Sequence, residues 1–156
     1  MDVKDAIRES YLAQGFTEEQ LEQLYSIART RSYNDGEPLL RQFDDNKDML
    51  ILASGRAHIL TLIGEPIGVV KAGMPLGEMS FLDDKPRSVS VVSSGRCEAV
   101  VFPAEPLREV LRERPDIALT ALINISRVLC ARLRAADNHL AALMAVEELE
   151  PAAARA

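Results

Sequence analysis

The chain has 156 residues, 47% of them hydrophobic and 27% charged, which is typical of a single globular domain with a sizeable core. Its net charge of −6 argues against a general nucleic-acid or anionic-membrane surface, because affinity for phosphate backbones depends on clustered Lys and Arg. No apolar run approaches the ~20 residues that cross a bilayer, and the N-terminus lacks the apolar core of a signal peptide. We therefore expect a cytoplasmic protein that binds no membrane, with Cys97 and Cys130 as free, mostly buried thiols.

Residues 1–33 predict an N-terminal helical segment. Val3, Ile7 and Leu12 recur at helical spacing before Gly15 interrupts the pattern. Thr17 and Gln20 have the spacing of a capping box, which predicts a second helix over 18–31.

Residues 34–105 change to short apolar runs separated by turn residues. The expected strands are 37–43, 48–53, 56–63, 67–71, 88–93 and 97–102, with turn signals such as Asn34-Asp35-Gly36 between them. Many short strands at close spacing predict a sandwich or a small barrel.

Residues 106–149 predict a short helix that ends before Pro115 and a long helix from about 116 onward. The apolar positions of the long helix follow spacings of three and four, and they are Leu122, Ile125, Leu129, Leu133, Ala136, Leu140 and Leu143. Such a narrow seam indicates a partly coiled-coil homodimer interface, with a helix packed wholly on its own domain as the alternative. Residues 150–156 are expected to form a disordered tail.

The segment from Leu76 to Val91 contains the most informative chemistry. Gly77 lets the backbone come close to another group, and Arg87 offers a planar set of donors suited to a phosphate. Ser88 adds a hydroxyl beside it, whereas Glu78 suits a sugar hydroxyl, as acidic residues do for ribose in dinucleotide sites. The pattern fits a phosphorylated sugar that keeps a free hydroxyl; a Glu78–Arg87 salt bridge between two strands is the alternative.

This segment resembles the phosphate-binding cassette of cyclic nucleotide-binding domains, the family of the catabolite activator protein and protein kinase A regulatory subunits. The likeness lies in Leu76-Gly77-Glu78-Met79-Ser80-Phe81-Leu82 followed by Pro86-Arg87-Ser88-Val89, and it extends over roughly residues 16–143. The resemblance implies a mainly β fold with flanking helices. Its centre is a jelly-roll-like barrel (a double-stranded β-helix) of about eight strands, with the cassette at 76–90, N-terminal helices and a long C-terminal helix.

The same resemblance implies roles for individual residues. Arg87 pairs with the cyclic phosphate, and Glu78 accepts the ribose 2′-hydroxyl. The backbone N–H groups of Glu78, Met79, Ser80 and Val89 complete the phosphate cage beside Gly77. Ser88 donates to a phosphate oxygen or reaches the base, and a Ser at this position favours cAMP over cGMP. Three residues depart from the family pattern, namely Val89 and Ser80 in place of Ala and Phe43 in place of Gly, and Val89 is expected to crowd the cage. Asp137 and Asn138 are candidates for a base contact from the long helix; a solvated helix face is the alternative.

We expect no catalytic residue, no metal site and no cofactor, because the chain lacks a local nucleophile motif, a P-loop or clustered His ligands. DNA binding by this chain alone is not expected either, since the helix that would read bases opens with Glu18, Glu19 and Glu22. The sequence thus predicts a stand-alone cyclic nucleotide sensor whose C-terminal helix rearranges on binding and transmits the signal to an effector protein. A non-binding dimerisation scaffold and a sensor of another phosphorylated metabolite remain alternatives.

Overall fold

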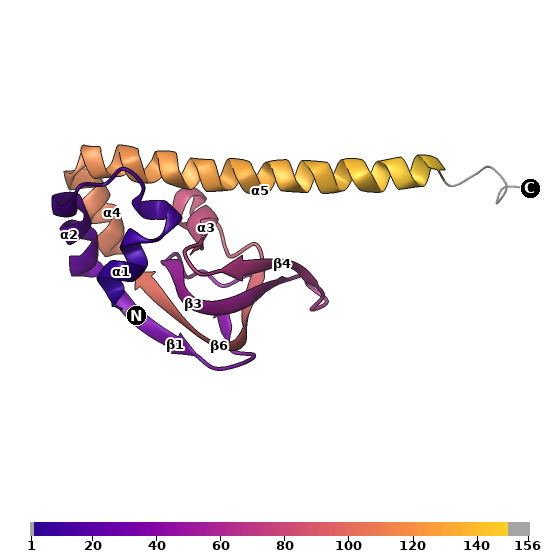
Figure 1. The fold of residues 1–156 in the computed structure, drawn as a ribbon, viewed down its shortest axis with the longest axis horizontal. Coiled ribbons are helices and arrows are strands. Elements are labelled where there is room, and N and C mark those ends of the chain that lie inside the picture. The colour runs from indigo at the N-terminus through magenta and orange to yellow at the C-terminus, as the bar shows by residue number, and fades with distance from the viewer. Residues whose placement is uncertain (1, 150–156) are drawn as a thin grey trace, which may run out of the picture. The chain divides into compact units, whose positions relative to one another are not determined.

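The computed structural model describes residues 2–149, so the predicted tail at 150–156 lies outside the described residues. The contacts divide the chain into two units, one up to Ile125 and one from Ser126. The first contains short N-terminal helices, an antiparallel sheet and two further helices, and the second contains most of a long helix (Figure 1).

The N-terminal segment folds as α1 (Val3–Arg8), a 3₁₀ turn η1 (Tyr11–Ala13) and α2 (Glu18–Ile27). The capping box predicted from Thr17 and Gln20 is confirmed, with each side chain bonded to the other residue's backbone N–H. The predicted end of this helix is wrong. The backbone becomes extended at Ala28, because Arg29–Tyr33 forms strand β1 and pairs with β6. Sheet pairing therefore overrides the local helical pattern.

The sheet has six strands among the described residues, and every pairing is antiparallel. They are β1 (Arg29–Tyr33), β2 (Pro38–Leu40), β3 (Met49–Leu60), β4 (Pro66–Lys71), β5 (Pro75–Leu76) and β6 (Ser90–Phe102). The order is β1–β6–β3–β4, with β2 on β6 and β5 on β3. The mainly β class with flanking helices is therefore confirmed, although the sheet is not closed.

The strand count is lower than the eight expected because two turn signals fall inside continuous strands. β3 runs through Ser54-Gly55 and β6 runs through Ser94-Gly95, with register shifts near residue 54 where the ladder bends. Gly55 has φ +83, and a Cβ there would lie 2.6 Å from Cβ of Cys97 on β6. A glycine at this point therefore marks a close approach of two strands and not the end of one.

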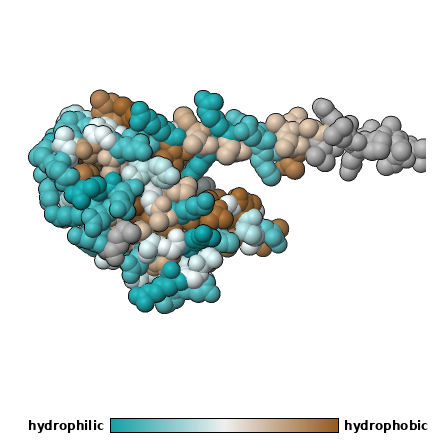
Figure 2. Space-filling model, viewed as in Figure 1, coloured by the Kyte–Doolittle hydropathy of each residue, from teal (hydrophilic) through white to brown (hydrophobic). Residues whose placement is uncertain are grey.

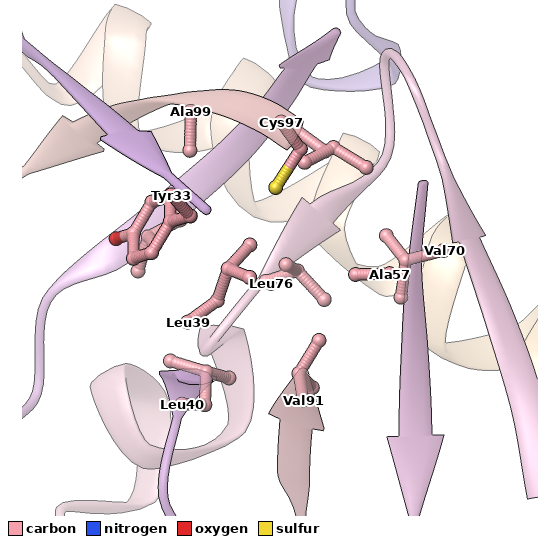
Figure 3. Close-up of a cluster of buried hydrophobic side chains, with 11 residues drawn as sticks. Tyr33, Leu39, Leu40, Ala57, Val70, Leu76, Val91, Cys97 and Ala99 are labelled. Atoms are coloured by element: carbon pink, nitrogen blue, oxygen red, sulfur yellow. The ribbon is translucent and has the colours of Figure 1, made fainter. Parts of the chain in front are cut away.

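One cluster of buried hydrophobic side chains packs between the strands of this sheet (Figure 3). Its buried side chains come from all six strands, and they are Tyr33, Leu39, Leu40, Leu50, Leu52, Ala57, Val70, Leu76, Val91, Cys97 and Ala99. Val89 packs against this cluster from the segment that leads into β6.

Three helices follow or interrupt the sheet: α3 (Glu78–Asp83), α4 (Ala104–Glu113) and α5 (Pro115–Leu149). The start of α5 belongs to the first unit, and its buried Asn124 donates to the carbonyls of Leu12 and Gln14, both at 2.8 Å. That side chain fixes the N-terminal segment to α5. No helix within residues 2–149 is long and apolar enough to span a bilayer.

Exposed apolar residues gather in two places. One is the hairpin of β3 and β4, where Leu62, Ile63, Ile67 and Val69 are exposed and where Figure 2 shows hydrophobic atoms at the surface. The other is α5, with Leu133, Leu140, Leu143 and Met144. Cys130, also on α5, is exposed, contrary to our expectation of two mostly buried thiols, whereas Cys97 is buried as expected.

Candidate functional site

Arg87 is the centre of the site. Arg87 is only 3% exposed. Its guanidinium donates to the carbonyl of Gly77 at 3.0 Å, to Oδ1 of Asn46 at 2.9 Å and to the carbonyl of Asp48 at 2.6 Å. A guanidinium has five N–H groups, and these three hydrogen bonds use at most three of them. Three neutral oxygens therefore orient a buried cation that keeps donors for a further group.

The electrostatics of Arg87 follow from this setting. Burial lowers the pKa of the guanidinium, while the charges of Asp48, Asp44 and Glu78 act in the opposite direction. Because arginine starts from a very high pKa, the side chain stays protonated at neutral pH.

The backbone of Arg87 is fixed by the turn before β3. Its N–H donates to the carbonyl of Asp44 and its carbonyl accepts from the N–H of Phe43, both at 2.9 Å. Phe43, where the resemblance leads one to expect Gly, has φ +69, a region that favours glycine. The backbone thus takes the left-handed conformation despite the bulky side chain, which is 67% exposed.

Gly77 precedes α3 and has φ +78. A Cβ at this position would lie 2.5 Å from Nη1 of Arg87 and 2.7 Å from the carbonyl oxygen of Asp48. A glycine is required here on two grounds, the backbone conformation and the space that the guanidinium occupies.

Glu78 and Ser80 are both buried in the first turn of α3, and Met79 between them is 50% exposed. Glu78 is 2% exposed, and its charge lies near enough to Arg87 to favour the protonated guanidinium. The first-turn amides of a helix have no acceptor within the helix, so those of Met79 and Ser80 suit an anion.

Ser88 is exposed, and its Oγ donates to Sδ of Met79 at 3.9 Å, a weak contact that joins the two halves of the cassette. Val89 is half-buried against the core. The structure thus places Arg87 beside Gly77 and Ser88 beside Met79, while the ligand roles of all these residues remain predictions.

A cavity of about 210 Å³ adjoins Arg87. It is lined by Arg31, Tyr33, Pro38, Leu39, Leu40, Arg41, Asp44, Asn46, Asp48, Leu50, Arg87 and Val101. Among these lining residues, Arg87 is the one that also belongs to the predicted site residues. The cavity therefore borders the predicted site on the side of β1, β2 and the loop before β3.

The two candidates for a base contact, Asp137 and Asn138, are exposed on α5 within the second unit. Their contact with a base stays a prediction.

The sequence reasoning missed Asn46 and Asp48. Both lie in a segment, residues 43–49, that by its acidic residues alone looks like a solvated turn. The available signal was the alternation of Asp44, Asn46 and Asp48, because Asx side chains bond to backbone amides two residues away. The structure has these bonds, from the N–H of Asn46 to Asp44 and from the N–H of Asp48 to Asn46.

Comparison with known proteins identifies the family. The family description "Cyclic nucleotide-binding domain" matches residues 30–114. The chain is 30% identical over 135 residues to the cyclic AMP receptor protein of Thermus thermophilus, covering 84% of this chain and 61% of that protein. A solved cyclic nucleotide-binding domain from Methylobacillus flagellatus superposes with a TM-score of 0.77 at 26% identity, covering 88% of this chain and 79% of that one. The chain belongs to the cyclic nucleotide-binding domain family, which confirms the resemblance seen in the sequence.

The relatives include longer proteins of other kinds. Glutaminase 1 of Bradyrhizobium diazoefficiens is 26% identical over 131 residues, covering 84% of this chain but only 21% of that enzyme. The chain therefore spans a fifth to three fifths of the length of these two relatives.

Proposed function

We propose that this chain is a regulatory module that binds a cyclic nucleotide, cAMP in preference to cGMP, and that it catalyses no reaction itself. The observation that carries the proposal is the buried Arg87, held by three oxygens and with donors to spare, beside the first turn of α3. Charge-assisted hydrogen bonds from such a group to a phosphate contribute roughly 1.5–3 kcal/mol each.

The preference for cAMP is supported by two considerations. Ser88 stands where the family resemblance associates Thr with cGMP, and the Thermus thermophilus relative is named a cyclic AMP receptor protein. In this proposal Glu78 accepts the ribose 2′-hydroxyl and Arg87 pairs with the cyclic phosphate.

The proposed output is a rearrangement of the C-terminal helices that acts on an effector, either another protein or a further part of a longer chain. A ligand shifts such an equilibrium only by its difference in affinity for the two arrangements. The match to a fifth of a glutaminase is consistent with a module that serves a larger protein.

Isothermal titration calorimetry with cAMP, cGMP and AMP tests the proposal. We expect heat of binding with cAMP, weaker binding of cGMP and none with AMP, and we expect the cAMP heat to vanish in Arg87→Leu. Arg96→Leu, at an exposed arginine of β6, is the matched control and should bind normally. Circular dichroism verifies that each variant is folded.

The outcomes separate the alternatives. Silence with both cyclic nucleotides contradicts the proposal and favours a dimerisation scaffold. Binding of AMP with equal affinity indicates a sensor of another phosphorylated metabolite.

A further inference from the structure

Asp48 bonds to two separate parts of the first unit. Its carbonyl oxygen accepts from Nη2 of Arg87 at 2.6 Å, and its Oδ1 accepts from the backbone N–H of Ala104 at 2.8 Å. One residue thus contacts both the guanidinium of the proposed phosphate site and the first residue of α4.

Asp48 is itself held in place by Asn46. The N–H of Asp48 donates to Oδ1 of Asn46 at 3.0 Å, and Nδ2 of Asn46 donates to Oδ2 of Asp48 at 3.2 Å. Since the same Oδ1 of Asn46 also accepts from Arg87, a shift of the guanidinium disturbs Asp48 through its carbonyl and through Asn46 together.

The bond to Ala104 matters because α4 has no cap of its own. Its N-cap residue is Pro103, which makes no side-chain cap hydrogen bond. Helix starts carry backbone N–H groups without intrahelical acceptors, and an acidic side chain there also favours the helix dipole. The carboxylate of Asp48, remote in sequence, supplies the cap.

We propose that Asp48 is a positioning residue that couples Arg87 to the start of α4. A phosphate that draws Arg87 toward itself changes the bond to the Asp48 carbonyl, and the carboxylate of the same residue transmits that change to the N–H of Ala104. This inference rests on the proposed binding of a cyclic nucleotide at Arg87, and it names the residue through which binding reaches α4.

A second connection, from α3 to α4, provides a competing route by which ligand binding could affect α4. Arg108 of α4 donates to the carbonyl of Phe81 at 3.3 Å and pairs with Asp84 at 3.4 Å, and its guanidinium lies 5.3 Å from the centre of the Phe81 ring. This connection joins α4 to α3 without Asp48, so the experiment must distinguish the two.

Hydrogen–deuterium exchange with and without saturating cAMP provides the test. In the wild type we expect cAMP to change exchange both in residues 77–90 and in the first turn of α4. Asp48→Ala removes the acceptor, and Ala104→Pro removes the donor at a first helical position that tolerates proline. In both variants cAMP should still protect residues 77–90, while the change in α4 falls to less than half of the wild-type value.

Two further variants are controls. Asp48→Asn keeps an Oδ1 acceptor and should retain the response of α4. If the loss in Asp48→Ala came from general destabilisation, the response would be lost in Asp48→Asn as well. Asp45→Ala removes a side chain that is 88% exposed and should behave as the wild type. If Asp48→Ala fails to fold by circular dichroism, Ala104→Pro carries the test.

The inference is overturned if α4 responds fully in Asp48→Ala or Ala104→Pro, which would assign the signal to Arg108, or if the wild type binds cAMP with no change in α4. Failure of the wild type to bind any cyclic nucleotide in the calorimeter instead overturns the proposed function.

Discussion

Gly77 and Arg87 form the tightest steric constraint of the site. Gly77→Ala places a Cβ 2.5 Å from Nη1 of Arg87, so the guanidinium must move. We expect a loss of roughly 1–3 kcal/mol in the free energy of unfolding, the usual cost of overpacking, together with weaker cAMP binding. Urea denaturation and calorimetry measure the two effects.

Gly64→Ala is the matched control, because Gly64 has φ +83 but a Cβ there meets nothing within 4 Å. It carries the same backbone strain without the clash. Equal loss of cAMP affinity in both variants would contradict the steric argument.

Replacing Phe43 by glycine should raise the free energy of unfolding, whereas Gly77→Ala should lower it. At φ +69 a side chain costs about 1–2 kcal/mol relative to glycine, while glycine loses about 0.5–1 kcal/mol more in chain entropy on folding. We therefore expect Phe43→Gly to stabilise the protein slightly, by up to about 1 kcal/mol in urea denaturation. Phe43→Ala keeps the strained Cβ and should show no gain; a gain of equal size would point to the exposed ring instead.

At the residue scale the sequence indicates the cassette residues more readily than the residues that hold Arg87 in place. Gly77, Glu78 and Arg87 lie in one short segment with a recognisable spacing. Asn46 and Asp48 reach Arg87 from a distant loop, and no local pattern encodes such a bond. Their Asx turns are visible in the sequence, but the partner of the loop is not.

At the element scale, one ion-pair cluster joins three helices. Arg114, which follows α4, bonds to Glu19 of α2 at 2.7 Å and to Asp116 of α5 at 2.9 Å. The hydrogen bonds from Arg114 hold the pKa of both carboxyl groups below their ordinary values.

A carboxyl group whose pKa is lowered by folding stabilises the protein above its ordinary pKa, about 4, and this contribution is lost as the pH falls further. We expect the melting temperature of the wild type to fall more between pH 5 and pH 2 than that of Arg114→Gln, in which both pKa values return toward normal. Parallel curves would show that the exposed cluster contributes nothing measurable, as many surface pairs do.

The bounds of helices and strands are predictable where a local sequence pattern sets them. They are not predictable where pairing between distant strands sets them. Thr17 and Gln20 start α2 as expected, because a capping box needs only adjacent residues. The end of that helix is decided by the pairing of Arg29–Tyr33 with β6, and β3 continues through Gly55 because β6 lies against it. Both outcomes depend on contacts far apart in the chain.

At the scale of the whole molecule, the exposed apolar residues of α5 bear on association. Leu133, Leu140 and Leu143 are all exposed on this helix and follow the spacing of a coiled-coil seam. We expect light scattering to give the mass of a dimer for the wild type and of a single chain for the double variant Leu133→Glu, Leu140→Glu. A wild-type mass of one chain would contradict the predicted homodimer.

The contrast between the two cysteines has a practical consequence. Cys97 is buried in the core, and burial raises the pKa of its thiol, which suppresses the reactive thiolate. Cys130 is exposed. A maleimide dye should therefore attach to Cys130 and not to Cys97 under native conditions, which gives one dye per chain without any engineered cysteine.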